Sequence, residues 1–124
     1  MLDSKGWVNS NQWRQRVERE LARAKAARTK GNEGRARVCA RRASGWAVEA
    51  YLQQRGLRLP TPSVLDQMRY LLTLPGITPR HKEILQHLLT VKQKSDLDAD
   101  SFFPLDVDLI AEAQELIAGL FPDY

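Results

Sequence analysis

The sequence predicts an all-α fold, an up-down bundle of the four-helix type with about five helical segments. Apolar residues recur every three or four positions along most of the chain, and no stretch alternates like a β-strand. Glycine and proline fall between these stretches, where helices end or begin. A length of 124 residues suits one domain. We therefore expect a single helical domain over residues 1–124, with residues 1–10 as an N-terminal extension.

The first two segments are separated by Gly31. The first is expected from Asn11 to Lys30, where apolar residues have helical spacing and Gly31 can end the helix. The second lies between Gly31 and Gly56 and is rich in alanine and arginine. One broad face carries mostly small side chains and a narrower apolar strip lies opposite, so we expect a central helix with neighbours on both flanks. The broad face comprises Ala36, Cys39, Ala40, Ala43, Trp46, Ala47, Ala50 and Tyr51.

Two Thr-Pro pairs predict the starts of the next two helices. Threonine can cap free amide groups, and proline suits the first helical position. Thr61-Pro62 is expected to open a short helix that stops at Leu74-Pro75-Gly76. Thr78-Pro79 is expected to open another that runs to about Lys94. Their predicted inward residues are Val64, Leu65, Met68, Leu71 and Leu72 in the first, and Ile84, Leu85, Leu88, Leu89 and Val91 in the second.

The last helix should follow an acidic surface loop over residues 95–101. Asp106 is expected to cap it, with Leu105 and Ile110 as a hydrophobic staple. Asp108 and Glu112 would then lie favourably near the positive end of the helix dipole. Its predicted inward residues are Ile110, Ala113, Leu116, Ile117 and Leu120.

Charge is distributed unevenly along the chain. Residues 1–60 hold 14 Lys and Arg against 5 Asp and Glu, whereas residues 61–124 hold 5 against 10. Such asymmetry can attract an acidic partner to the first half. It can equally pair the two halves within a bundle or a dimer, and both interpretations stay open.

Four arginines cluster on the second segment. Arg35 and Arg42 lie on one line of the helix, and Arg37 and Arg41 lie on another. Guanidinium groups bind phosphates and carboxylates. We therefore predict an anion-binding site for a nucleotide, RNA or an acidic partner protein.

Three stretches together resemble a known family. Trp13 begins a charged helix, the run Cys39-Ala40-Arg41-Arg42-Ala43 precedes Ala47-Val48-Glu49-Ala50-Tyr51-Leu52, and Phe103-Pro104 precedes an acid-capped final helix. On these features residues 13–121 resemble a HEPN domain (higher eukaryotes and prokaryotes nucleotide-binding). The resemblance implies a paired up-down bundle and a homodimer. It also implies a partner encoded nearby, either a small nucleotidyltransferase or the antitoxin of a toxin-antitoxin pair.

Ribonuclease members of that family carry an arginine and a histidine with four to six residues between them. Arg80 and His87 have this spacing at its upper limit. His87 would move the proton of an RNA 2′-hydroxyl while Arg80 stabilised charge on the phosphate. Along one helix the two groups would stand roughly 10 Å apart, so they would need a dimer partner or a large bound phosphate to cooperate. The alternative is a solvated helix face in which Glu83 pairs with His87.

Other site signals are weak. Asp96, Asp98 and Asp100 alternate like the start of a calcium loop, but Ser101 and Val107 replace the glycine and glutamate that such a loop requires. We predict no metal and no cofactor.

Location and redox state follow from what the sequence lacks. Cys39 is the only cysteine, so we expect a buried core thiol and neither an internal disulfide nor a cysteine zinc cluster. No apolar run is long enough for a membrane span, and the N-terminus lacks the apolar stretch of a secretory signal. A cytoplasmic protein without membrane contact is therefore expected.

These observations lead to one functional hypothesis and two alternatives. The first is a non-catalytic HEPN-like module that binds an anionic ligand or an acidic partner through Arg35, Arg37, Arg41 and Arg42. The second is a metal-independent ribonuclease that uses Arg80 and His87. The third is a structural dimeric adaptor.

Overall fold

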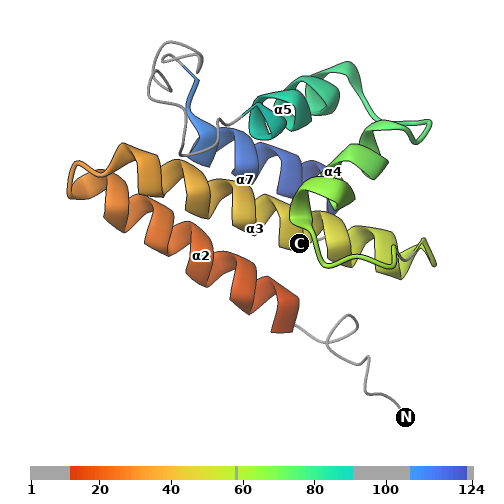
Figure 1. The fold of residues 1–124 in the computed structure, drawn as a ribbon, viewed down its shortest axis with the longest axis horizontal. Coiled ribbons are helices and arrows are strands. Elements are labelled where there is room, and N and C mark those ends of the chain that lie inside the picture. The colour runs from red at the N-terminus through yellow and green to blue at the C-terminus, as the bar shows by residue number, and fades with distance from the viewer. Residues whose placement is uncertain (1–11, 58, 91–106, 123–124) are drawn as a thin grey trace.

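The computed structural model describes residues 12–57, 59–90 and 107–122 of the chain. That part forms five helices and no strand, which confirms the all-α prediction. The helices are α2 (Gln12–Thr29), α3 (Glu33–Gln54), α4 (Val64–Leu72), α5 (Pro79–Leu89) and α7 (Leu109–Leu120) (Figure 1).

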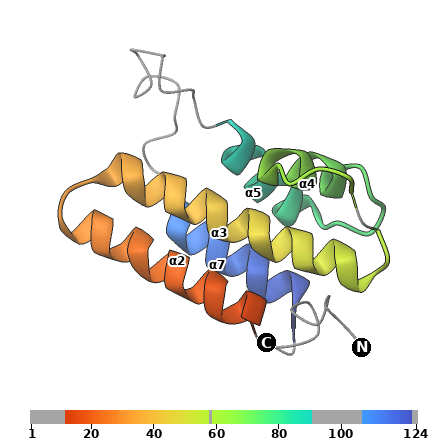
Figure 2. The same ribbon diagram turned by 60° about the horizontal axis from the view of Figure 1, so that its bottom comes forward.

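Helix α3 is the central element of the bundle. It forms an antiparallel hairpin with α2, and α7 lies along the same pair. Helix α4 packs on another side of α3, and α5 packs on α4 and α7 (Figures 1 and 2). The predicted central position, with neighbours on both flanks of this helix, is confirmed.

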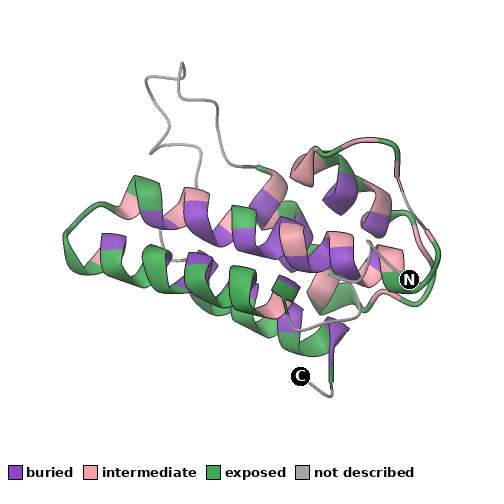
Figure 3. Cartoon of the chain, turned by 90° about the horizontal axis from the view of Figure 1, so that it is seen from below, coloured by how far each residue is buried: buried purple, intermediate pink, exposed green. Residues whose placement is uncertain are grey.

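The core is built largely from the small side chains of α3. Ala36, Ala40, Ala43 and Ala47 are fully buried, so the neighbouring backbones approach closely. Longer side chains from the other helices fill the remaining space, and the buried faces turn inward along α2, α3 and α7 (Figure 3). At the open end of the α2–α3 hairpin, the buried ring of Trp13 lies 4.2 Å from that of Phe121, centroid to centroid.

Two glycines allow helices to pass at very short range. A Cβ atom on Gly45 of α3 would overlap the side chain of Val64 at the start of α4. A Cβ atom on Gly119 of α7 would overlap the imidazole of His81 on α5. These two contacts set how close α4 and α5 lie to the α2–α3–α7 layer.

The helix starts agree only in part with the sequence prediction. Thr78 caps α5 and Pro79 takes its first turn, as expected. The short helix starts later than predicted, because Ser63 rather than Thr61 caps α4. Thr61 instead accepts the N–H of Ser63 with its hydroxyl, which tightens the turn before the helix.

The ends of α5 and α7 correct two further predictions. Helix α5 ends at Leu89 instead of near Lys94, and Thr90 closes it by donating its hydroxyl to the carbonyl of His87. The cap of α7 is Asp108 rather than Asp106, since Asp108 accepts the Ala111 N–H. The predicted acidic loop, the staple residue Leu105 and the calcium-like run from Asp96 lie outside the described residues.

Candidate anion-binding face

The four arginines predicted as one site lie in three different surroundings. Arg35 is exposed on the flank of α3 that faces α2. Arg42, on the same flank, binds Glu20 of α2. Arg37 lies within 3.7 Å of Glu33, and its side chain is only 15% exposed. Arg41 is half-buried and lines a separate pocket beside α4. The structure therefore brings Arg35 and Arg42 to the flank of α3 that faces α2, and Arg42 also borders the pocket that Arg41 lines.

Arg37 adjoins an ion-pair network that ties three helix ends together. Arg28, near the end of α2, donates to both oxygens of Glu33 at 3.0 and 2.8 Å and to Asp108, the cap of α7, at 2.8 Å. Hydrogen bonds from Arg28 lower the pKa of both carboxyl groups and raise the pKa of the guanidinium. Arg37 therefore lies beside ion pairs that hold the fold together, and the described residues give it no separate place for a ligand.

The flank of α3 that carries Arg35 and Arg42 faces a row of cations on α2. Arg16, Arg19, Arg23 and Lys30 follow one another at spacings of three, four and seven residues, so they share one side of α2. All four are exposed. We name these four residues together with Arg35 and Arg42 the basic face. The sequence prediction missed its α2 half, although the helical spacing of the four cations was a readable signal.

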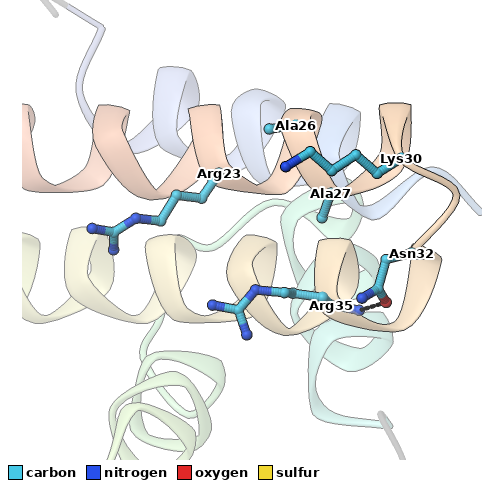
Figure 4. Close-up of a pocket in the computed structure, with 6 residues that line it drawn as sticks. All are labelled: Arg23, Ala26, Ala27, Lys30, Asn32 and Arg35. Carbon is cyan, nitrogen blue, oxygen red and sulfur yellow. Dashed lines mark hydrogen bonds between the residues drawn. The ribbon is translucent and has the colours of Figure 1, made fainter.

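A groove of about 440 Å³ lies between the two rows of the basic face near the α2–α3 turn. Arg23 of α2, Lys30 of the α2–α3 turn and Arg35 of α3 border it, and their cationic ends extend in the same direction along the groove (Figure 4). Asn32, the cap of α3, accepts the N–H of Arg35 at the mouth of the groove. Three cationic side chains thus surround a space that no carboxylate of the described residues lines.

Glu20 is the one carboxylate that the described residues place within the basic face, and it is buried. Its side chain is 1% exposed and accepts Arg23 Nη1 at 2.9 Å and Arg42 Nη1 at 2.8 Å. The arginine side chains are 63% and 44% exposed, so their outer atoms face solvent. Glu20 therefore joins the two rows from below and positions both guanidinium groups. Five net positive charges remain on the face.

Glu20 also affects the buried thiol of Cys39. Cys39 is fully buried, as predicted from its position on the small-residue face. Burial raises its pKa, and hydrogen bonding to Glu20 raises it further. The thiol is therefore held in its unreactive protonated form.

Trp46 closes the basic face toward the far end of α3. It is half-buried rather than fully buried as predicted. The Arg16 guanidinium lies 3.9 Å from its ring centroid and covers part of the ring. Glu49 follows about one turn further along α3 and ends the run of positive charge. The indole face is thus occupied by a cation of the protein itself.

The predicted nuclease pair lies elsewhere, where α5 packs on α7. Arg80 donates to Glu115 at 3.0 and 3.1 Å and to Glu83 at 2.9 Å, and it lies 3.3 Å from Glu112. His87 Nδ1 lies 2.8 Å from Glu112, whose carboxylate is 10% exposed. The Arg80 and His87 side chains therefore converge on one carboxylate within a single chain, in contrast to the separation expected along one helix.

The surroundings of this pair are acidic. Three glutamates face Arg80, and bonding to them raises its pKa, while the Arg80 hydrogen bonds lower the pKa of Glu115. A phosphate would have to displace one of these carboxylates to reach Arg80. The arrangement is suited to holding α5 on α7.

The described residues offer neither a metal cluster nor a membrane span. No group of three His, Cys, Asp or Glu side chains among them is placed to hold a metal ion. None of the described helices is both long and apolar enough to cross a bilayer.

Comparison with protein-family models, with curated proteins and with solved structures finds no match to this chain. The resemblance to HEPN domains therefore stays a prediction from the sequence.

Proposed function

We propose that this chain binds the phosphate backbone of RNA through the basic face of the α2–α3 hairpin and does not catalyse a reaction. The observation that carries the proposal is the pair of cationic rows, in which Glu20, the carboxylate found there among the described residues, lies buried beneath two arginines. This surface retains the anion-binding role predicted for Arg35 and Arg42 and replaces Arg37 and Arg41 with cations of α2.

The dimensions of the basic face suit a linear polyanion. From Arg16 to Lys30 the α2 row extends about 21 Å, at 1.5 Å of rise per residue. One strand of a nucleic acid helix carries a phosphate about every 3.4 Å, so about six phosphates span the same length. Six side-chain cations along this distance can neutralise several phosphates at once.

The face favours contacts with phosphates over contacts with bases. Trp46 is the aromatic ring that the described residues place beside this face, and the Arg16 guanidinium already stacks on it where a base could otherwise stack. Arginine and lysine on exposed helix surfaces attract a backbone without reading its sequence. We therefore expect binding with little sequence preference and a strong dependence on salt.

The test is fluorescence anisotropy with a labelled single-stranded RNA over a range of salt concentrations. Lys30→Gln/Arg35→Gln removes two exposed cations of the groove without breaking any ion pair found among the described residues. We expect weaker binding and a log–log salt slope shallower by about 1.4, because each phosphate of a single strand that is no longer neutralised reduces the slope by about 0.7.

A matched control removes the same charge elsewhere. Lys25 lies on another side of α2 and Lys82 lies on α5, and both are exposed. Lys25→Gln/Lys82→Gln should leave the salt slope unchanged. An equal loss in both double variants would mean that net charge alone attracts RNA, and absence of binding at low salt would refute the proposal.

The ribonuclease alternative is less well supported by the geometry. A nuclease site needs a cation free to meet the scissile phosphate, and Arg80 is already engaged by three glutamates. We expect no metal-independent RNA cleavage. Cleavage that disappears in both Arg80→Ala and His87→Ala, with the fold intact, would reverse this conclusion.

A further inference from the structure

A second pocket, of about 420 Å³, lies on the flank of α3 that faces the start of α4. Arg41 and Arg42 supply its charge, and no carboxylate of the described residues borders it. Val38, Val64 and Leu65 supply apolar walls. Charge and apolar surface thus meet in one concave space, which is the usual composition of a small-molecule site.

Arg41 is the cation without a counter-charge in this pocket. Arg42 is bound to Glu20 and Arg37 lies near Glu33, but Arg41 makes no hydrogen bond or ion pair within the described parts of the chain. The residue is half-buried. Burial, followed by the nearby charge of Arg42, lowers its pKa. A partly desolvated guanidinium beside a second one is an unfavourable arrangement that a bound anion would relieve.

We propose that this pocket binds a small organic anion, whose phosphate or carboxylate oxygens meet Arg41 and Arg42 and whose apolar body packs on Val38, Val64 and Leu65. Arg42 gives one nitrogen to Glu20 and keeps its other donors for the ligand. The planar guanidinium of Arg41 can bind two oxygens of one acidic group at once.

This site is distinct from the proposed RNA-binding function, although Arg42 borders both. The groove of the basic face is bordered by Arg23, Lys30 and Arg35, and none of these lines the α3–α4 pocket. The pocket has apolar walls that a phosphodiester backbone would not need. Failure of one proposal therefore leaves the other standing.

Calorimetric titration with four probes separates the head group from the body of the ligand. Phenyl phosphate carries both parts, inorganic phosphate only the head and phenol only the body, while benzoate replaces phosphate by carboxylate. We expect phenyl phosphate or benzoate to bind at least about tenfold more tightly than inorganic phosphate or phenol, because burying a ring of this size adds about that factor or more. The stronger of the two acids identifies the preferred head group. Equal affinity for phenyl phosphate and inorganic phosphate, with no binding of benzoate, would overturn the proposal.

Two variants test the site by charge and by volume. Arg41→Gln should abolish binding of the preferred acid, and Leu65→Trp should do the same by filling the pocket without changing its charge. Lys30→Gln/Arg35→Gln is the control, and it should bind that acid like the parent protein. Retained binding in Arg41→Gln would refute the assignment.

Thermal unfolding of the ligand-free protein supplies an independent measurement. Since Arg41 has no partner among the described residues, Arg41→Gln should raise the melting temperature of the ligand-free protein by about 2 to 4 °C. The preferred acid, which should raise the melting temperature of the parent protein, should leave that of Arg41→Gln unchanged. A lower melting temperature would show that Arg41 supports the fold itself, which would contradict the proposed role.

Discussion

Replacing Glu20 by glutamine should make the protein less stable and at the same time strengthen its binding to RNA. The carboxylate is buried beneath the basic face and accepts one hydrogen bond from Arg23 and one from Arg42. Glutamine keeps the volume of the side chain but removes its charge. It also introduces an amide group that faces two guanidinium donors. The two effects have opposite signs because the same carboxylate supports the fold and lowers the charge of the surface.

The magnitudes follow from burial and distance. A hydrogen bond to a charged group contributes about 1.5–3 kcal/mol. Water can reach both arginines, whose side chains are 63% and 44% exposed, so much of this loss is recovered. We expect a total cost of about 1–2 kcal/mol. One unit of charge roughly 6 Å from a phosphate changes its energy by about 0.7 kcal/mol in water before salt screening, which gives about a two- to threefold gain in RNA affinity at low salt.

Two assays measure these effects on the same preparation. Urea unfolding followed by circular dichroism gives the free energy of unfolding, and fluorescence anisotropy gives the RNA affinity at low and high salt. Glu18→Gln is the matched control, since Glu18 lies on α2, is exposed and borders the α2–α7 side instead. A folded Glu20→Gln protein that binds RNA no better than Glu18→Gln, or that is as stable as Glu18→Gln, would contradict this role of Glu20.

Two further predictions concern the helix contacts. Arg28→Gln should reduce stability by about 1 kcal/mol at neutral pH, after allowance for the partial exposure of all three side chains. Hydrogen bonds from Arg28 lower the folded pKa values of Glu33 and Asp108, so this stability is present above about pH 4.5 and is lost as the pH falls through the folded values. Acid titrations of unfolding should therefore converge for the parent and the variant once the pH lies below both folded pKa values. Gly45→Ala should cost about 1–3 kcal/mol or prevent folding, because its Cβ would overlap a side chain of α4. Gly34→Ala is the control, because its Cβ would have no neighbour closer than 3.9 Å, and it should stabilise α3 by up to about 1 kcal/mol. Thermal unfolding of both variants measures the difference, and equal effects of the two changes would contradict the close packing at Gly45.

The helices and their buried faces could be predicted from sequence because both depend on local spacing. The alanine face of α3, from Ala36 to Ala50, is buried as predicted. Helix starts were less predictable, since two candidate caps often lie a few residues apart. Thr61 and Ser63 compete in this way before α4, and the contact of Val64 with Gly45 favours the later start.

The candidate site was only half predictable. Arg35 and Arg42 share the basic face, but Arg37 is held near Glu33 and Arg41 turns toward α4. The helical wheel of one segment shows which residues share a line. It does not show which neighbouring helix faces that line, and this decides whether an arginine meets solvent, a carboxylate or a pocket.

By itself, the sequence determined that the protein is helical, that α3 is central and that positive charge gathers in the first half of the chain. These properties follow from residue type and from spacings of three and four residues. Only the tertiary structure decided the partner of each charge. Arg42 meets Glu20 over 22 residues, Arg80 meets Glu115 over 35, and Arg28 meets Asp108 over 80. Such pairs form where packed helices bring side chains within about 3 Å, and that distance depends on how the whole core is filled.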